Sequence, residues 1–435
     1  MKAWFPLYLG ARNLLGRRGR ASPHLAGSIL GIGLSLVPLI LVLVVADGMI
    51  EGITRRYLEL GTYHAQVILP PDFEEREVSG LLERLRSQPG VRLAIEERQG
   101  LGLLYTPTER TAVTVRAVPP ELYAEDGGFR RYFRLDSGGF QLGAPDSILL
   151  GRETAQRLGV GPGDRVKLLV LRGIGQRREL PLVAALTVRG VFSTGYQELD
   201  KQWVYIPLAA SWHLLAGRGA SRFLGLKLDE PFSGLEGQLA RLRRVLPPRA
   251  EIYSWFELEK ANFKSFQTTK VLLLFIMALI VVVATVNISG ALIMVVLEHL
   301  PEIAFLKAMG AGPGAISLSF LVTGLLTGLA GTVLGLAAGL AVALNVNSLI
   351  RGLEAALNGG ARLFGILAAP VARLPAPPPL RIFNSEFYLE RIPIHLHFGE
   401  LYAVGAATLL LAVLAAYLPA RKAGRTRPLQ VLRRY

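Results

Sequence analysis

The chain has 435 residues, of which 51% are hydrophobic and 19% are charged, and it contains no cysteine. A mean hydropathy of +0.39 is too high for an ordinary soluble enzyme, whereas the charged fraction is too large for a chain buried in the membrane throughout. The lack of cysteine excludes disulfides and thiolate metal sites. Most of the net charge of +15 lies in two basic tails, residues 1–23 and 420–435, so we predict no nucleic-acid partner.

Four apolar stretches are long enough to cross a membrane: residues 25–46, 270–297, 313–346 and 401–419. The first has 22 residues, about 33 Å as a helix, against a hydrocarbon core of about 30 Å. A cleaved signal peptide is the rival interpretation, because a basic segment precedes this stretch. It is disfavoured, since signal sequences have shorter apolar regions and no small-residue cleavage site follows.

An even number of spans places both ends of the chain on one side, and the basic tails, residues 1–24 and 420–435, predict that this side is the cytoplasm. We therefore expect a multi-pass protein of the inner (cytoplasmic) membrane. Residues 298–312 form a cytoplasmic loop, whereas residues 347–400 form an extracytoplasmic loop that contains prolines. The predicted fold is an integral membrane α-helical protein with four transmembrane helices and a large extracytoplasmic α+β domain between the first two, at residues 47–268.

The texture of the predicted extracytoplasmic domain is one of short alternating apolar runs separated by Gly and Pro, together with a few helical stretches. Strands are predicted at residues 112–118, 147–150, 189–192 and 203–207. Helices are predicted at residues 81–88 and 153–158, and as stalks next to the membrane at residues 48–60 and 252–266.

The four predicted spans contain no ionisable side chain in their interiors, which disfavours an ion-coupled carrier. The third span carries small-xxx-small repeats that let helices approach closely: Gly324, Gly328, Gly331, Gly335 and Gly339. These glycines serve either packing within the chain or a dimer seam. Asn287 in the second span is interpreted as an interhelical hydrogen-bonding residue rather than a ligand site.

The sequence contains none of the P-loop, G-x-S-x-G or H-E-x-x-H patterns that are typical of catalytic sites. His395 and His397 alternate in a predicted extended segment, but two histidines without a third ligand do not predict a metal site. We therefore expect no enzyme activity, no metal and no cofactor bound by this chain.

Two segments next to predicted spans carry a family resemblance. Residues 295–311 contain the pattern E-x-x-x-E-I-A-x-L-x-x-x-G-A, from Glu298 to Ala311. Residues 418–433 follow P-A-R-x-A-x-x-x-x-P-x-x-x-L-R. Both resemble the corresponding segments of FtsX-like, MacB-type ABC transporter permeases.

Within that superfamily the chain looks most like the lipoprotein-releasing (Lol) permeases. The similarity lies in five segments: residues 28–33, 45–49, 148–164, 190–200 and 387–393. Two departures stand out. Residues 351–380 are unusually long and rich in Pro and Ala, and residues 171–180 predict only a short hairpin where some of these permeases carry a chaperone-binding hook.

The resemblance implies that a separate ABC ATPase similar to LolD binds the cytoplasmic face, with ATP and Mg in that partner. It also implies a second permease copy or paralogue. The residues expected to form the ATPase-coupling loop are Glu298, Glu302, Ile303, Phe305, Leu306, Lys307 and Gly310. Apolar residues among polar neighbours suit docking on a partner.

The leading hypothesis is that the protein extracts lipoproteins from the inner membrane, driven by ATP hydrolysis in the partner, and passes them to a periplasmic carrier similar to LolA. Val45, Met49 and Ile50 are candidates for the wall of a substrate cavity in contact with membrane lipids. Two alternatives stay open: efflux of amphiphilic small molecules or peptides, and activation of a cell-wall hydrolase without transport.

Overall fold

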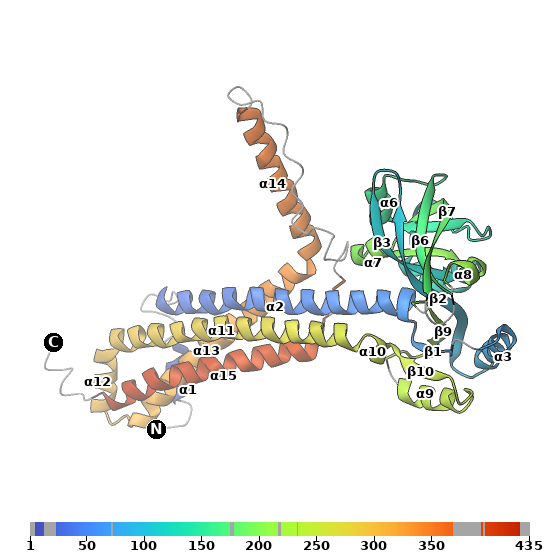
Figure 1. Ribbon diagram of the computed structural model, residues 1–435. Helices are drawn as coiled ribbons and strands as arrows, with labels where there is room; N and C mark the ends of the chain where they lie inside the picture. The colour runs from blue at the N-terminus through green and yellow to red at the C-terminus, as the bar shows by residue number, and fades with distance from the viewer. Residues whose placement is uncertain are drawn as a thin grey trace. The chain divides into compact units, whose positions relative to one another are not determined.

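The computed structural model describes residues 5–12, 23–70, 73–174, 178–215, 219–232, 234–368, 393–394 and 396–426. Within these ranges, the side chains of residues 5, 24, 172–174, 178–180, 284, 287 and 362–368 are outside the described set. The chain forms two compact units, divided near residues 48 and 266. One is a helical bundle and the other is built around a β-sheet (Figure 1).

The helical unit contains α1 (Phe5–Arg12), the first part of α2 (Pro23–Tyr57), most of α11 (Lys260–Glu298), α12 (Leu300–Ala308), α13 (Pro313–Leu344), α14 (Val346–Ala368) and α15 (Phe398–Arg425). Among the described residues, four helices are long and apolar enough to cross a membrane, namely α2, α11, α13 and α15. They coincide with the four apolar stretches of the sequence. With 35 and 39 residues, α2 and α11 measure about 52 and 58 Å, well beyond a hydrocarbon core of about 30 Å.

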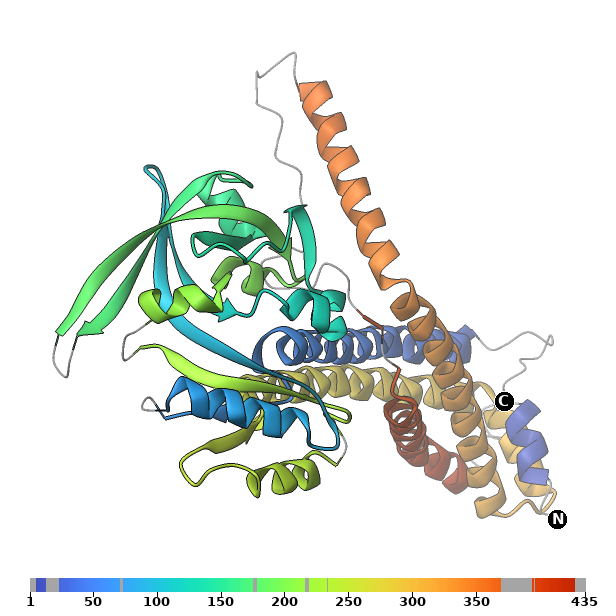
Figure 2. The same ribbon diagram turned by 90° about the vertical axis from the view of Figure 1, so that its right-hand side faces the viewer.

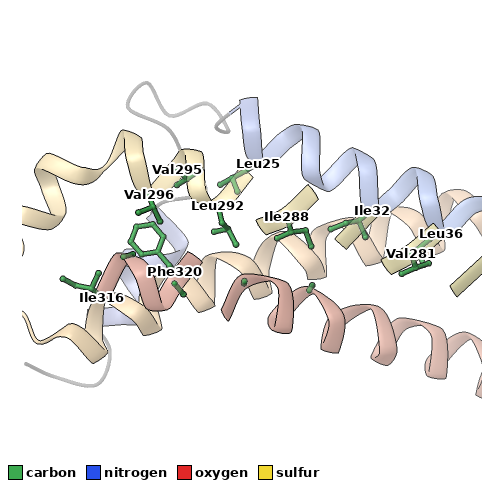
Figure 3. Close-up of a cluster of buried hydrophobic side chains, with 14 of the residues drawn as sticks. Leu25, Ile32, Leu36, Val281, Ile288, Leu292, Val295, Val296, Ile316 and Phe320 are labelled. Carbon is green, nitrogen blue, oxygen red and sulfur yellow. The ribbon is translucent and has the colours of Figure 1, made fainter. Parts of the chain in front are cut away.

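The core of the bundle is apolar. Ile32 and Leu36 of α2, Ile288 and Leu292 of α11 and Phe320 of α13 are buried in one cluster, where their side chains point toward one another (Figure 3). Dense packing of this kind fixes the positions of neighbouring helices. The bundle is therefore held chiefly by van der Waals contact between apolar side chains.

The glycines of α13 let it approach two neighbours. A Cβ on Gly324 or Gly328 would lie 2.3 or 2.5 Å from the Cβ of an alanine in α15. The other three lie against α2, where a Cβ would come within 2.8 Å of a side chain: Gly331 on Ile32, Gly335 on Leu36 and Gly339 on Ile40. Packing within the chain thus accounts for all five glycines. The side chain of Asn287 lies outside the described residues.

Gly328→Leu is expected to lower the free energy of unfolding of the full chain by about 1–3 kcal/mol, because the new side chain overlaps Ala412. Gly314→Leu, near the start of the same helix, is the matched control, since a Cβ there meets nothing within 4 Å. Thermal unfolding of both variants in detergent measures the difference. Equal unfolding midpoints for the two would contradict the close approach of α13 and α15.

The second unit contains ten strands: β1 (Ala65–Ile68), β2 (Val91–Tyr105), β3 (Arg110–Val118), β4 (Arg134–Gly138), β5 (Ser147–Gly151), β6 (Arg165–Ile174), β7 (Arg178–Ser193), β8 (Trp203–Pro207), β9 (Ser221–Leu228) and β10 (Glu251–Ser254). Its helical elements are η1 (Leu58–Thr62), α3 (Glu75–Arg86), α4 (Leu122–Glu125), α5 (Gly127–Tyr132), α6 (Arg152–Leu158), α7 (Gln197–Gln202), α8 (Leu208–Leu214), α9 (Leu235–Arg243) and α10 (Trp255–Leu258). The sheet is mixed, as expected for an α+β domain.

Six of these strands pair in a closed circuit, β2–β3–β8–β5–β7–β6, and β6 returns to pair with β2 (Figure 2). Each strand of the circuit contributes inward-facing residues to one buried core cluster, for example Val115 of β3, Leu168 of β6 and Val204 of β8. A second cluster joins α3 and α9 to β9 and the strands beside it. Because alternate side chains of a strand point to opposite faces, the pairing leaves the other face of the β6–β7 hairpin toward solvent.

Several predicted elements match the structure, including β8 at residues 203–207 and β5 at residues 147–151. Three differ. Residues 251–254 form β10, paired with β1, rather than the start of a helix. The hairpin predicted at residues 171–180 is longer, because β6 and β7 pair continuously from Arg165 with Thr187 to Ile174 with Arg178. Residues 347–368, predicted as loop, belong to α14, whose apolar side chains recur at helical spacing.

Candidate functional site

The loop between α11 and α13 folds into the short helix α12, which lies at one end of the bundle. Pro301 stands in the first turn, where its missing N–H is not needed. Gly310 ends the loop with φ of +93°, a conformation that favours glycine. A Cβ there would meet nothing within 4 Å, so backbone conformation rather than lack of space requires glycine at this position.

Three side chains of α12 hold it against the bundle. Ile303 and Ala304 are buried, and Ile303 belongs to the bundle core. Leu306 packs against the same core. Of the residues expected to couple to a partner, Ile303 is therefore inside this chain, and its role is to fix the orientation of α12.

Polar contacts tie α12 to two further helices. Lys307 Nζ donates to the carbonyl oxygens of Gly424 and Thr426, each at 2.6 Å, at the end of α15. Glu302 Oε2 lies 3.5 Å from Arg12 Nη2 of α1. Since α1 is itself held on α13 by a hydrogen bond of 3.1 Å from Thr323 Oγ1 to the Gly10 carbonyl, α12 is braced from several sides.

Two large apolar side chains point away from this braced helix. Phe305 is 63% exposed and Met309 is 71% exposed. The sequence identified Phe305 but not Met309, although the spacing of four residues places both on the same side of a helical turn. Glu298, the last residue of α11, is also exposed. We name Phe305 and Met309 the coupling surface.

At the opposite end of α11 an ion cluster joins three helices, and sequence analysis did not find it. Lys270 Nζ of α11 lies 2.5 Å from Asp47 Oδ1 of α2 and 2.9 Å from Glu400 Oε1 of α15. His397 Nδ1 is 3.6 Å from the other Asp47 oxygen. The second oxygens of Asp47 and Glu400 are buried without a hydrogen bond, so the two carboxylates depend on one ammonium.

Lys270→Met is expected to lower the free energy of unfolding by about 1–3 kcal/mol, because it leaves two partly buried carboxylates without their shared cation. Adding Asp47→Asn and Glu400→Gln restores part of the loss. Lys201→Met, at an exposed lysine of α7, is the control. Thermal unfolding in detergent measures all three. A triple variant less stable than Lys270→Met alone would contradict the repulsion between the carboxylates.

The three candidates for a substrate cavity, Val45, Met49 and Ile50, are all partly buried along α2. An apolar groove of about 470 Å³ lies elsewhere, between α13 and α15, with Leu336, Leu340 and Leu401 in its wall. None of the three candidates lines this groove.

No group of three or more histidine, aspartate or glutamate side chains arranged to hold a metal occurs among the described residues. His397 is described and lies near Asp47, whereas His395 is outside the described residues.

In the sheet-containing unit, the residues that follow α2 are fixed by buried charges. Arg116 Nε and Nη2 donate to the two Glu97 carboxylate oxygens at 2.6 and 2.8 Å, and neither side chain is exposed. Arg116 also donates to the Gly61 carbonyl at 3.1 Å, and Tyr63 OH donates to Glu97 at 2.5 Å. Burial lowers the pKa of Arg116, but the adjacent Glu97 carboxylate outweighs it and raises the pKa overall.

A second cluster acts on the same segment. Lys227 Nζ of β9 donates to the Glu59 side chain at 2.6 Å and to the Glu59 carbonyl at 2.9 Å, and it pairs with Asp126. Arg56 Nε donates to the Thr194 carbonyl at 2.8 Å. Residues 56–63, which follow the apolar part of α2, are therefore locked to the strands of this unit from several directions.

Comparison with known proteins matches both halves of the chain. A family model described as FtsX-like permease C-terminal matches residues 274–428, and one described as MacB-like periplasmic core domain matches residues 25–233. Among solved structures, the periplasmic region of MacB from Actinobacillus actinomycetemcomitans is 13% identical, with a TM-score of 0.31, and covers 47% of this chain and 94% of that chain.

Curated relatives extend over nearly the whole chain. The lipoprotein-releasing system transmembrane protein LolC of Neisseria meningitidis serogroup B is 26% identical and covers 100% of this chain and 99% of its own length. The lipoprotein-releasing system transmembrane protein LolE of Haemophilus influenzae is 26% identical over 93% of both chains. The chain thus matches the FtsX-like permease and MacB-like periplasmic core models over most of its length, and it is similar throughout to ABC transporter permeases of lipoprotein-releasing systems.

Proposed function

We propose that this permease, together with a separate ATPase, extracts lipoproteins from the inner membrane and passes them to a periplasmic carrier. The observation that carries the mechanical part of the proposal is the coupling surface. Phe305 and Met309 are apolar and exposed, yet they stand on a helix that is fixed to the bundle by Lys307 and Ile303. Exposed apolar side chains on a rigid support favour a protein partner.

The proposed orientation puts α12 and both tails in the cytoplasm, as the basic charge of the tails indicates. The ATPase then binds at the coupling surface, and ATP and Mg²⁺ bind to the ATPase chain. The sheet-containing unit lies in the periplasm. Since permeases of this kind work in pairs, a second copy or a paralogue completes the transporter with a second ATPase.

Movement is proposed to pass from α12 along the long helices. A displacement of α12 acts on α11, and bundle packing carries it to α2. The ion pairs that hold residues 56–63, Arg116 with Glu97 and Lys227 with Glu59, resist bending at the far end of α2, because breaking them leaves charges unpaired inside the protein. The periplasmic unit is therefore proposed to move with α2, and its motion expels the lipoprotein.

The face for the carrier is proposed on the β6–β7 hairpin. Leu171 and Val183 are 58% and 49% exposed, and the register places them on one face with Leu101 of β2, which is 78% exposed. An exposed apolar sheet face of this kind suits a partner that receives lipidated protein.

Leu171→Asp together with Val183→Asp is expected to reduce transfer to the carrier about tenfold, because two charges would be buried in the contact, a cost of at least about 1.4 kcal/mol. Ile68→Asp, an exposed apolar position on β1, is the control. Transfer is measured as lipoprotein recovered with soluble carrier. Undiminished transfer by the double variant would rule out this face.

Depletion of the protein in cells tests the proposed substrate. Lipoproteins are expected to accumulate in the inner membrane, as seen by membrane fractionation. If lipoproteins reach their usual location and an amphiphilic compound accumulates in the cell, the protein is an efflux permease instead. If neither changes and cell-wall cleavage stops, it activates a hydrolase.

A further inference from the structure

The helix α14 has two faces of opposite character. At 100° per residue, Val346, Leu349, Ile350, Leu353 and Leu357 fall on one side of the helix. The opposite side carries polar and small residues: Asn347, Arg351, Glu354, Ala355 and Asn358. A helix with this division is stable only when its apolar side is covered.

Beyond its first turn, the apolar side of α14 is largely open in the described chain. Leu349, Leu353 and Leu357 are 50%, 55% and 45% exposed, although they stand in a row at intervals of four residues. Among the described elements, α14 contacts chiefly α13. Val346, its first residue, is buried. Something outside the described part of this chain therefore covers the row.

The position of α14 indicates what that is. It begins two residues after α13, one of the four helices able to cross a membrane, and Asn345 breaks the helix between them. The Asn345 carbonyl accepts hydrogen bonds of 2.9 Å from the Ser348 and Leu349 amides, which starts the new helix at once. The first turn of α14 thus stands where α13 leaves the hydrocarbon.

The direction of α14 also indicates that membrane lipid covers its leucines. It turns away from the bundle and runs across the direction of α2 and α11 instead of extending α13 (Figures 1 and 2). Since the bundle helices cross the membrane, a helix transverse to them runs along the membrane surface. In that position its leucines reach the acyl chains, while Arg351 and Glu354 stay in the headgroup layer.

We propose that α14 is an interfacial helix. Its face with Leu349, Leu353 and Leu357 is buried in the lipid at the membrane surface where α13 ends. It braces the ends of α13 and α15 laterally against the bilayer. The proposal is independent of what the transporter carries.

Spin labels test this directly, and the absence of cysteine from the chain removes the need for background mutations. Leu353→Cys and Leu357→Cys report on the apolar side, and Arg351→Cys and Ala355→Cys report on the polar side of the same turns. Each full-length variant is labelled, reconstituted in liposomes of phosphatidylethanolamine and phosphatidylglycerol, and its collision rates with oxygen and with a water-soluble nickel chelate are measured.

The labels at 353 and 357 are expected to collide with oxygen several-fold more than with the chelate, and the labels at 351 and 355 are expected to show the opposite ratio. Chelate access at all four positions would overturn the proposal, because the helix would stand in water. Low access to both reagents at 353 and 357 would overturn it equally, since a protein surface would then cover the leucines. All four positions are exposed in the described chain, and gel filtration of each labelled variant checks that the fold is kept.

Discussion

Replacing Phe305 and Met309 together by alanine is expected to weaken binding of the ATPase partner about 30-fold, which corresponds to about 2 kcal/mol. Both side chains are mostly exposed, so their removal takes little from the chain's own core. The loss is expected in the affinity of the two proteins and in transport, while insertion and thermal unfolding stay close to wild type.

A matched control exists in Phe398→Ala. Phe398 is 64% exposed, almost the same as Phe305, but it begins α15 at the end of that helix remote from Lys307. Copurification and titration of the ATPase on both variants separate a coupling role from a general effect of losing an exposed phenylalanine. Equal ATPase affinity for the two variants would show that the partner binds elsewhere.

Arg116→Met is expected to lower the free energy of unfolding of the sheet-containing unit by about 3–5 kcal/mol, because Glu97 then remains as a buried charge without its partner. The guanidinium lies 4.3 Å from the Trp203 ring, so the fluorescence of that ring follows the change. Thermal unfolding of the full chain, followed by tryptophan emission, measures it.

Two further variants define the effect. Arg92→Met removes an exposed pair with Asp229 and is expected to cost no more than about 1 kcal/mol. Arg116→Met combined with Glu97→Leu recovers part of the stability, because the remaining charge is gone. If Arg92→Met and Arg116→Met lower the free energy of unfolding equally, the buried pair of Arg116 and Glu97 is not what holds residues 56–63 in place.

The four helices long and apolar enough to cross a membrane were predictable because hydropathy is a property of the local sequence. Each of α2, α11, α13 and α15 coincides with an uncharged or nearly uncharged stretch. The segment proposed to bind the ATPase was identified through its sequence motif. The sequence did not predict which of its side chains point outward. Ile303 and Phe305 are both strongly apolar, and only the packing of α12 on the bundle distinguishes them.

Contacts between residues far apart in the chain could not be predicted from the sequence. Lys270 meets Asp47 and Glu400 from three separate helices, and nothing in the sequence pairs them. Arg116 and Glu97 lie on paired strands, but a charged residue within a strand pattern is ordinarily placed on the solvent face. The helix α14 was missed because its glycines and alanines weakened the apolar periodicity.

The central proposal is that ATP hydrolysis, transmitted through α12, releases lipid-anchored protein from the membrane. Proteoliposomes holding the permease, the ATPase and a lipidated protein, supplied with ATP and soluble carrier, test it most directly. Release of the lipidated protein to the carrier is expected with ATP, and neither with a non-hydrolysable analogue nor with the Phe305→Ala, Met309→Ala variant. Retention of the lipidated protein in the membrane while ATP is hydrolysed would contradict the proposal.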